Sequence, residues 1–543
     1  MKRPPVPLTK AELTHCLETS THADVLEFLR VLATKTDKIR IESIGASAEG
    51  RDIASVIVSP ARVFTPEAAD KRGLLKILVI ANIHAGEVEG KEACQMLARD
   101  LTLGAPPAWL KKCVIVIIPD YNPDGNDRID KKNRVLDLEK LDGQVGPEGG
   151  VGTRYTGAGI NLNRDYMKQE AVESVLLSKA FGRWKPHLTI DCHTTDGSIH
   201  GYDLTWDTSH TVESGPRGPI LYARDTMLPE IGRRLFRKHK FRTFFYGNYR
   251  NQDDPTLGWE TYSPLPRYGS HYRGLTGRMD VLLEAYSYIP FDRRIDVMYA
   301  TLLELFTYAA QNAATIKSIV DRAETETIAR GLAPSPFDLV GINYGVSHPA
   351  PDGQVSMTYP AHAFPNPVSI ESWDRATLKS RRIEKGKRAK YRALFYGRFA
   401  PTRSVRRPFA YVVPESVIPR LQDHNIRVVR LAAPLSAPVE RYLVLDLKKT
   451  QSPDVGTHTM RETVLWTRSE TSPRSLPAGT AIVPMAQPLA HVAAYLLEPE
   501  SDDGFARWGL LETEPAPGSE YPVARINAPV EIRSQRTPDS SRR

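Results

Sequence analysis

Residues 74–87, LLKILVIANIHAGE, decide the fold of this 543-residue chain. The stretch Leu74–Asn82 is almost continuously apolar, which is typical of a strand that is covered on both faces. It leads into His84-Ala85-Gly86-Glu87, and the residues that follow have the apolar spacing of a helix over 88–103. This order predicts an α/β unit. Because ligands bind outside the carboxyl ends of the strands in such sheets, the polar residues after the strand are candidates for chemistry.

Three further motifs stand at the ends of apolar runs. Asn122-Pro123-Asp124-Gly125 follows Cys113–Ile118, His193 closes Leu188–Cys192, and Glu284 closes Met279–Leu283. The runs predict core strands of the same sheet, so we expect the motifs to meet at one edge. Two imidazoles and two carboxylates at that edge suit a metal site with a base beside it.

The chain is too long for one hydrophobic core, so at least two domains are expected. Residues 1–331 are predicted to form an α/β domain that has a mixed, mostly parallel central sheet with helices on both faces. Its last helix is expected over roughly residues 293–330, before the breaking sequence Leu332-Ala333-Pro334-Ser335-Pro336. Residues 332–533 are Pro-rich with short strand-like runs, which predicts a smaller β-rich or α+β accessory domain, and the polar residues 534–543 predict a disordered tail.

Composition and charge argue against nucleic acids and membranes as partners. The net charge of +8 is modest, and much of the excess lies in Lys379–Arg392, where eight basic residues stand against Glu384. This run lacks a series of interleaved aromatic residues for base stacking, so a solvated segment is favoured over nucleic-acid binding. No stretch approaches the roughly 20 apolar residues that span a bilayer.

The cysteines bear on the compartment. The four cysteines form no C-x-x-C pair and no disulfide-framework spacing. No apolar segment of a secretory signal follows the basic first residues. A cytoplasmic location is therefore expected. A secreted or periplasmic protein whose signal peptide has been removed would show the same pattern.

His84, Glu87 and His193 are the candidate ligands of one zinc ion. Zinc in hydrolases is typically held by two histidines and a glutamate, with water in the fourth position. Taken singly, His193 can also be a satisfied core histidine, Glu284 can cap the helix that follows it, and Asn122–Gly125 can be only a turn. Their combination at strand ends favours the metal site.

The order of these motifs resembles that of the zinc carboxypeptidases of the M14 (carboxypeptidase A-like) family over roughly residues 40–290. The motifs that carry the resemblance are Ser47-Ala48-Glu49-Gly50-Arg51, His84-x-x-Glu87, Asn122-Pro123-Asp124-Gly125, Asn161-Leu162-Asn163-Arg164 and the strand-end His193. Glu284 falls where that family has its catalytic glutamate. Residues 333–543 have no part in the resemblance, which implies the family's fold for the first domain and one Zn²⁺ per chain.

The resemblance also implies roles for the metal ligands and the catalytic groups. His84, Glu87 and His193 match the zinc ligands, and Glu284 matches a general base that acts on a zinc-bound water. Arg154, nine residues before Asn163, matches an arginine that polarises the scissile carbonyl. The alternative for Arg154 is a loop-ordering role.

Substrate binding is implied for three other side chains. Asn163 and Arg164 match the pair that holds the terminal carboxylate of the substrate, a role that suits the planar fork of a guanidinium group. Arg134 is a competing candidate for an auxiliary substrate contact. The assisting tyrosine of the family can be Tyr262, Tyr268 or Tyr272, and the motifs do not choose among them.

Two departures from the family pattern stand beside this pair. Asn161 occupies a position where the family commonly has Asp, and it would offer a zinc-bound imidazole a neutral acceptor. Such changes around a metal ligand can cost roughly 10–100-fold in metal affinity or activity. Asp165 stands where the family usually has Asn, which is expected to add negative charge beside the pair.

The expected function is a zinc-dependent metallocarboxypeptidase that hydrolyses the C-terminal peptide bond of peptides or proteins. One alternative is an amidase or deacylase of the same superfamily that acts on cell-wall peptides or N-acyl amino acids. Another is a catalytically weak binding module whose C-terminal half does the main job. For the accessory domain, a lid, a docking surface and structural support are equal alternatives.

Overall fold

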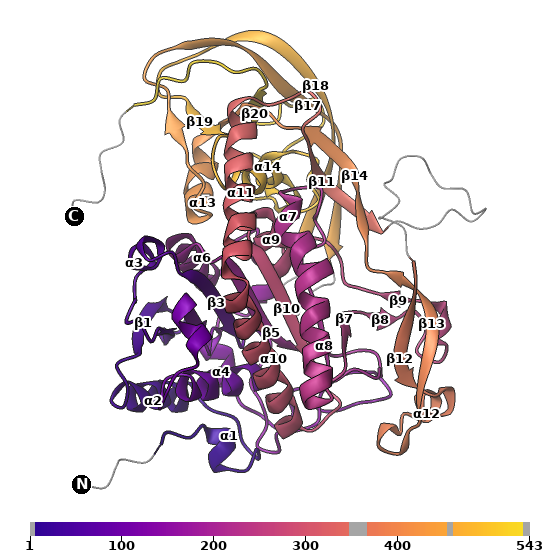
Figure 1. Ribbon diagram of the computed structural model, residues 1–543. Helices are drawn as coiled ribbons and strands as arrows, with labels where there is room; N and C mark the ends of the chain where they lie inside the picture. Colours follow the sequence, from indigo (N-terminus) through magenta and orange to yellow (C-terminus); the bar gives the residue numbers. More distant parts are fainter. Residues whose placement is uncertain (1–5, 347–365, 453–459, 536–543) are drawn as a thin grey trace.

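The computed structural model describes residues 6–346, 366–452 and 460–535 (Figure 1). Its largest sheet has eight strands in the order β1-β2-β4-β3-β5-β10-β6-β7. The strands are β1 (Ile39–Ala46), β2 (Asp52–Val58), β3 (Leu75–Ala81), β4 (Cys113–Ile118), β5 (Leu188–Thr194), β6 (Leu204–Asp207), β7 (Thr243–Phe245) and β10 (Met279–Ala285).

The four predicted core strands are confirmed as β3, β4, β5 and β10. They lie side by side and run parallel, whereas β2 is antiparallel to both β1 and β4, and β6 is antiparallel to β10 and parallel to β7. The predicted mixed, mostly parallel sheet is therefore correct. Parallel neighbours present their carboxyl ends at one edge, so the four motifs are brought to the same side of the sheet.

Helices cover both faces of this sheet. One face packs against α2 (His22–Ala33), α4 (Glu89–Asp100), α8 (Leu228–His239) and α10 (Phe291–Gln311). The other face packs against α3 (Pro66–Lys71), α6 (Val172–Trp184) and α9 (Gly269–Leu275). Three short helices lie between these elements, namely α1 (Lys10–Leu13), α5 (Pro123–Asn126) and α7 (Arg217–Tyr222).

The long helix expected over residues 293–330 is two helices, and that prediction is corrected. α10 ends at Gln311 and α11 (Ala313–Leu332) begins one residue later, with Asn312 between them at φ −107° and ψ 22°. The Asn312 side chain donates to the Tyr308 carbonyl oxygen at 2.9 Å. An Asn side chain that bonds to nearby backbone competes with helix continuation, which explains the break. Figure 1 shows α10 and α11 following one another along the molecule.

The C-terminal region is rich in strands, as predicted. A six-stranded sheet contains β16 (Val429–Arg430), β19 (Ala481–Pro484), β15 (Ala410–Val413), β20 (Ala524–Ile526), β17 (Leu435–Ser452) and β18 (Met460–Leu476), in that order. A second pair is β11 (Leu339–Val346) with β14 (Phe399–Arg406). Helices α13 (Ile418–Asp423), α14 (Ala490–Leu497) and α15 (Phe505–Trp508) pack among them. β17 and β18 arch over the top of the molecule in Figure 1.

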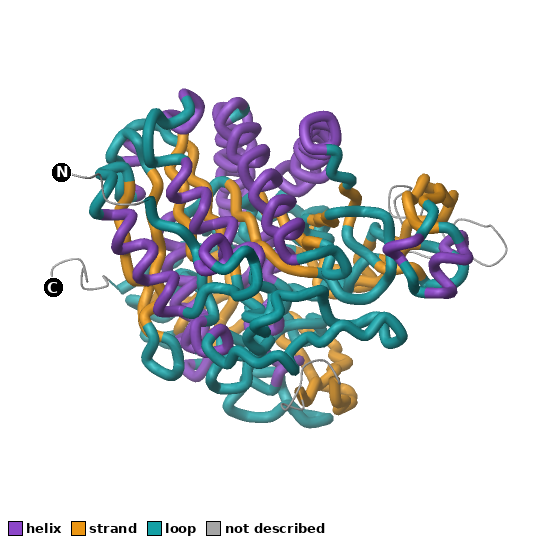
Figure 2. The backbone as a smooth tube through the Cα atoms, turned by 90° about the horizontal axis from the view of Figure 1, so that it is seen from below, coloured by secondary structure: helices purple, strands orange, loops and turns teal. Residues whose placement is uncertain are grey.

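A small sheet joins the two parts of the chain. Its order is β12 (Asn366–Trp373), β13 (Arg388–Tyr396), β9 (Trp259–Glu260) and β8 (Asn248–Tyr249). β12, β13 and α12 (Arg375–Ser380) lie at the right-hand edge of the molecule in Figure 1 and again in Figure 2. The basic run Lys379–Arg392 therefore belongs to a helix end and a strand, and Arg388 stacks on Trp373 at 4.5 Å.

One hydrophobic core continues from the main sheet into the C-terminal region. Leu78 and Leu177 from the first part share a buried cluster with Tyr411 and Leu421 from the second. The boundary predicted after residue 331 falls at the end of α11 and stays a prediction.

The predicted tail lies mostly outside the described residues. Residues 536–543 are not described, whereas Ser534 bridges to Leu431 and Gln535 donates to the Arg430 carbonyl oxygen at 2.9 Å. Within the described ranges, no helix has the length and apolar character of a bilayer span.

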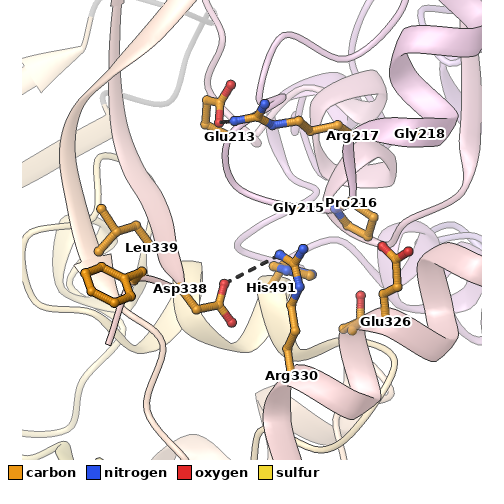
Figure 3. Close-up of a pocket in the computed structure, with 12 residues that line it drawn as sticks. Glu213, Gly215, Pro216, Arg217, Gly218, Glu326, Arg330, Asp338, Leu339 and His491 are labelled. Carbon is orange, nitrogen blue, oxygen red and sulfur yellow. Dashed lines mark hydrogen bonds and ion pairs between the residues drawn. The ribbon is translucent and has the colours of Figure 1, made fainter. Parts of the chain in front are cut away.

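A cavity of about 560 Å³ lies between the two parts, away from the strand-end motifs. Its walls come from the loop before α7, the end of α11, the start of β11 and α14 (Figure 3). Asp338 on this wall forms an ion pair with Arg330 at 3.5 Å and a second with the buried Arg407 at 2.6 Å. The pair with Arg330 connects the two parts of the chain, and the pair with Arg407 lies within the C-terminal part.

Candidate metal centre and active site

His84, Glu87 and His193 converge on one point at the edge of the main sheet. Glu87 Oε1 lies 3.0 Å from His84 Nδ1, Glu87 Oε2 lies 3.0 Å from His193 Nδ1, and the two Nδ1 atoms are 3.3 Å apart. All three side chains are buried. Four-coordinate zinc with ligand bonds of about 2.0–2.1 Å separates its ligand atoms by about 3.3 Å, so the residues present fit a zinc ion.

The loop after β3 is shaped for this convergence. A Cβ atom at Gly86 would lie 2.7 Å from the Arg134 side chain and 3.0 Å from the Gly152 carbonyl oxygen, so no larger residue fits. The Ala85 N–H donates to the Thr153 carbonyl oxygen at 3.1 Å. Asn122 donates to the Ile83 carbonyl oxygen at 3.1 Å, which holds the backbone next to His84.

The far nitrogen of each imidazole has its own partner. His84 Nε2 lies 3.1 Å from Asn161 Oδ1, and His193 Nε2 lies 3.0 Å from Asp191 Oδ1. The Asn161 acceptor places a proton on Nε2 of His84 and leaves Nδ1 free to bind metal, and the Asp191 charge favours the same arrangement in His193. The expectation that Asn161 offers a neutral acceptor to a ligand histidine is confirmed by this contact.

Asp191 is a residue that the sequence analysis missed. It stands two positions before His193 in β5, so both side chains lie on the same face of the strand. Asp191 is buried and is also bound by Arg273 Nη2 at 2.7 Å. A carboxylate inside a predicted core strand, two residues before a candidate ligand, is the signal that would have found it.

Charge around the ligands differs between the two histidines. Burial and the nearby Arg154 guanidinium lower the pKa of His84 to about 3. Burial also lowers the pKa of His193, but Asp191 and Glu87 outweigh it and raise that pKa well above its ordinary value. The site therefore holds the two rings in different electrostatic environments.

The two candidate arginines have different positions. Arg154 Nη1 lies 3.2 Å from His84 Nδ1, and its side chain lines the cavity beside the ligands. Arg134 Nη1 lies 3.2 Å from Glu87 Oε1, while its other groups donate to Gln144 and to the Thr195 carbonyl oxygen, each at 3.1 Å. Arg134 is not among the cavity-lining side chains, so its contacts favour orienting Glu87.

The cavity at the strand ends has a volume of about 350 Å³. Its walls combine metal-ligating, acidic, basic and aromatic side chains, among them His84, Glu87, Arg154, Tyr155, Asn163, Arg164, Asp196, Tyr246, Tyr262, Tyr268 and Glu284. Glu284 is the register partner of His193 in the neighbouring strand, which places the carboxylate beside the ligands. Burial raises the pKa of Glu284 well above its usual range, and the nearby Glu87 adds to the rise.

Asn163 and Arg164 reach the cavity from the loop after Asn161. Asn163 Oδ1 accepts a hydrogen bond from the Gly269 N–H at 2.9 Å. The Arg164 guanidinium carbon lies 4.0 Å from the centre of the Tyr268 ring, in a cation–π contact. We call Asn163 and Arg164 the clamp pair.

Asp165 is not among the residues that line the cavity, and its effect on the charge beside the clamp pair stays a prediction. Asp165 is fully buried and accepts hydrogen bonds from the backbone N–H groups of Glu170 at 3.2 Å and Ala171 at 2.9 Å. Burial raises the pKa of Asp165 to about 6. Its role is to hold the chain that leads into α6, because both of its carboxylate oxygens accept hydrogen bonds from that backbone.

The structure distinguishes the three candidate tyrosines. Tyr262 and Tyr268 line the cavity, and the Tyr262 hydroxyl lies 2.6 Å from Ser270 Oγ. Tyr272 points elsewhere, because its hydroxyl donates to His424 Nδ1 at 2.8 Å. Tyr246 also lines the cavity and was missed, since nothing in its local sequence sets it apart from the other aromatics of this region.

Two of the predicted motifs support the site without entering it. Asp124 accepts hydrogen bonds from Ser47 Oγ at 2.6 Å, from the Glu49 N–H at 3.0 Å and from Arg51 Nη1 at 2.9 Å. Asp124 thus joins the two turns. In the second turn, the Gly125 carbonyl oxygen accepts from the Thr153 N–H at 2.9 Å, which steadies the loop that carries Arg154.

Comparison with known proteins finds a family model that matches part of this chain. The family described as zinc carboxypeptidase matches residues 25–186. This match contains His84 and Glu87 and ends before His193 and Glu284, whose places in the site rest on geometry.

Curated relatives extend the likeness along the chain. Carboxypeptidase 2 of Trichophyton rubrum is 23% identical over 535 residues, covering 92% of this chain and 85% of that protein. Carboxypeptidase 2 of Trichophyton equinum is 23% identical over 514 residues, covering 88% and 81%. The similarity therefore continues past the expected range of 40–290 into the C-terminal region. A solved metallo-carboxypeptidase from Burkholderia cenocepacia aligns at a TM-score of 0.36 with 16% identity, over 53% of this chain and 69% of its own.

Proposed function

We propose that this chain, a zinc metallopeptidase that belongs to the zinc carboxypeptidase family, hydrolyses the last peptide bond of a peptide or protein with Glu284 as general base. The observation that carries the proposal is the shared cavity. His84, Glu87, Glu284 and the clamp pair line one space of about 350 Å³, and His193 converges with His84 and Glu87 behind its wall. The name carboxypeptidase 2 of the relatives supports the same substrate class.

The mechanism begins with the groups that this chain supplies around the metal. His84, Glu87 and His193 would hold the zinc ion, which when bound lowers the pKa of water and polarises a carbonyl. Glu284 takes a proton from the attacking water at its carboxylate oxygen and returns it to the leaving amine. Burial raises the pKa of Glu284, which favours the second half of the exchange, in which the side chain acts as an acid toward the leaving amine.

Charge that develops on the scissile carbonyl oxygen needs a donor near the ligands. Arg154 is the side chain in position, since its Nη1 atom already lies 3.2 Å from His84 Nδ1 at the cavity wall. A donor that is aimed at the developing oxyanion is among the larger contributions to such catalysis.

The clamp pair sets which bond is cut. Arg164 can bind a terminal carboxylate through two parallel N–H groups, and Asn163 can donate from its amide nitrogen because its oxygen already accepts from Gly269. A substrate that is anchored by its carboxylate presents only its last peptide bond to Glu284. The proposed activity is therefore that of an exopeptidase.

The test uses the zinc-loaded full chain and two peptides of one sequence, one with a free C-terminus and one amidated. We expect release of the C-terminal residue from the free peptide only, with one zinc ion per chain by metal analysis. Equal cleavage of both peptides would overturn exopeptidase action. Cleavage of N-acyl amino acids in preference to peptides would favour the deacylase alternative, and the absence of bound zinc would favour a binding module.

A further inference from the structure

The loop Arg267-Tyr268-Gly269 touches both members of the clamp pair. The Gly269 N–H donates to Asn163 Oδ1 at 2.9 Å, and Tyr268 packs against the Arg164 guanidinium at 4.0 Å. Nothing larger than glycine fits at position 269, where a Cβ atom would lie 2.7 Å from an Arg273 nitrogen. The position of this loop therefore sets the direction of the Asn163 amide and the plane of the Arg164 fork.

The C-terminal region holds this loop through Arg267. Asp503 Oδ1 accepts from Arg267 Nε at 3.0 Å, and Asp503 Oδ2 accepts from the Arg267 backbone N–H. Glu462 in β18 accepts from Arg267 Nη1 at 2.8 Å. Trp508 lies under the guanidinium at 4.3 Å and donates its ring N–H to Asp503 at 2.8 Å.

These charges are withdrawn from solvent. The side chains of Arg267 and Asp503 are 2% and 0% exposed, and that of Glu462 is 8% exposed. Breaking a buried pair by removing one charge leaves the other without compensation. The bond from Asp503 to the Arg267 backbone N–H, one residue before Tyr268, also constrains the main chain of the loop and not only a side chain.

A second brace reaches the other segment of the clamp. His424, just after α13, accepts from Gln169 Nε2 at 2.9 Å, and its Nε2 atom lies 3.2 Å from the Met167 carbonyl oxygen. Arg420 in α13 donates to the Lys168 carbonyl oxygen at 2.8 Å. The chain just after Asn163 and Arg164 thus also rests on the C-terminal region.

We infer that the C-terminal region is a positioning element of the substrate-binding site, in which Asp503 and Glu462 fix Arg267 and thereby hold the clamp pair in its carboxylate-binding arrangement. Asp503, Glu462 and Arg267 are positioning residues, because they act through Tyr268 and Gly269. The inference rests on the proposed function, since it needs Asn163 and Arg164 to bind the substrate carboxylate. Of a lid, a docking surface and structural support, this inference favours structural support, directed at the clamp pair.

The test compares Asp503→Asn with a matched control, Asp338→Asn. Both remove one carboxylate charge from a buried Asp–Arg pair, but Asp338 pairs with Arg407 inside the C-terminal region, lies on the wall of the separate cavity in Figure 3 and does not contact the loop. Steady-state kinetics of the zinc-loaded full chain are measured with the free-acid peptide. Since small misplacements of a binding group can cost up to 10²-fold, we expect Asp503→Asn to raise KM about tenfold, with kcat and zinc content close to those of the parent.

Glu462→Gln keeps Asp503 and provides the same test if Asp503→Asn does not fold. It is expected to raise KM by a smaller factor. Arg267→Ala is also expected to raise KM, and Arg267→Lys is expected to raise it less than Arg267→Ala does. If KM in the Asp503 and Glu462 variants equals that of Asp338→Asn, the inference is overturned while the proposed function stands. If the parent protein does not prefer the peptide with a free C-terminus, the proposed function itself is overturned. The parent's preference therefore distinguishes failure of the proposed function from failure of this inference.

Discussion

Asn161 Oδ1 lies 3.1 Å from Nε2 of His84, whose other ring nitrogen faces Glu87. The second ligand histidine, His193, has the carboxylate of Asp191 in the corresponding place at 3.0 Å. One imidazole is therefore supported by a neutral oxygen and the other by a charged one. A charged acceptor makes a ligand imidazole a stronger donor to metal, so the two outer partners would contribute unequally to zinc binding at this candidate site.

Asn161→Asp is expected to tighten zinc binding. The change supplies a charged acceptor to His84 and removes the Asn161 amide nitrogen, a buried donor with no partner among the described residues. We expect the zinc Kd to fall by about tenfold in a chelator competition assay. Asp191→Asn is the opposite change and should raise the Kd. A weaker zinc affinity in Asn161→Asp would contradict the assigned role of the His84 Nε2 contact.

Glu284→Gln separates metal binding from proton transfer. The amide keeps the size of the side chain but cannot accept the proton, so kcat should fall by about 10²–10⁴-fold. Zinc content should remain at one ion per chain, because Glu284 is not one of the three converging ligands. Metal analysis and peptide hydrolysis on the same sample make the comparison, and near-parental turnover would eliminate Glu284 as the base.

Arg154→Ala and Arg164→Ala should affect different kinetic constants. Loss of a donor to the oxyanion acts in the transition state, so Arg154→Ala is expected to lower kcat by about 10²–10³-fold. Loss of a carboxylate contact acts on binding, so Arg164→Ala should chiefly raise KM for the free-acid peptide. Steady-state kinetics of both variants check the assignment, which fails if the two changes have the same profile.

Asp502 gives the protein a pH-dependent stability. Burial raises the pKa of Asp502 to about 7, and its oxygens accept from Tyr495 at 2.6 Å and from the Tyr344 N–H at 3.0 Å. A raised pKa in the folded state means that the protonated form is favoured there. The contribution of protonated Asp502 to the free energy of unfolding is fully present below its unfolded-state pKa of about 3.9. It is lost as the pH rises through its folded-state pKa of about 7.

Asp502→Asn should remove that dependence. Its amide can replace the protonated carboxyl without ionising, so the variant is expected to have the higher free energy of unfolding at about pH 8 and a similar one at about pH 4.5. Urea unfolding of parent and variant across this range measures the difference. Burial also raises the pKa of Asp207 to about 7, so the pH dependence of the parent alone does not isolate Asp502. The difference in unfolding free energy between parent and variant does. A constant difference at all pH values would refute the assignment.

Asp124→Ala should destabilise the fold without emptying the metal site. It removes the acceptor that Ser47, Glu49 and Arg51 share, and Asp124 is fully buried. Arg51 is 32% exposed, so solvent screening reduces the ion-pair part, and we expect a loss of about 2–3 kcal/mol. Denaturant unfolding checks the loss. Failure of the folded variant to bind zinc would show that the turn does more than support the loop.

The strand-end pattern predicted much of the site. The runs around residues 75–81, 113–118, 188–194 and 279–285 are buried strands with polar residues at their ends, and they are adjacent in the sheet. Apolar periodicity is a local property of the chain, so these elements could be located without knowing their neighbours. The convergence of His84, Glu87 and His193 followed, because parallel strands present their carboxyl ends together.

Other features depended on contacts that no local pattern encodes. The substrate contact of Arg134 stays a prediction, whereas its bonds to Glu87, Gln144 and a backbone carbonyl are visible only in the structure. The predicted helix over residues 293–330 is broken at Asn312, where a side-chain hydrogen bond competes with the backbone. The cytoplasmic location stays a prediction.

The sequence by itself determined the α/β sheet and predicted the ligand types and the candidate base, because strand burial, helix spacing and polar strand ends are properties of short stretches of chain. Only the tertiary structure decided which acceptors face the outer nitrogens of His84 and His193 and which tyrosines line the cavity. It also decided that Asp503 binds Arg267, 236 positions away in the sequence. Such contacts join segments far apart in the chain, and their pairing is set by the packing of the whole molecule rather than by the residues on either side.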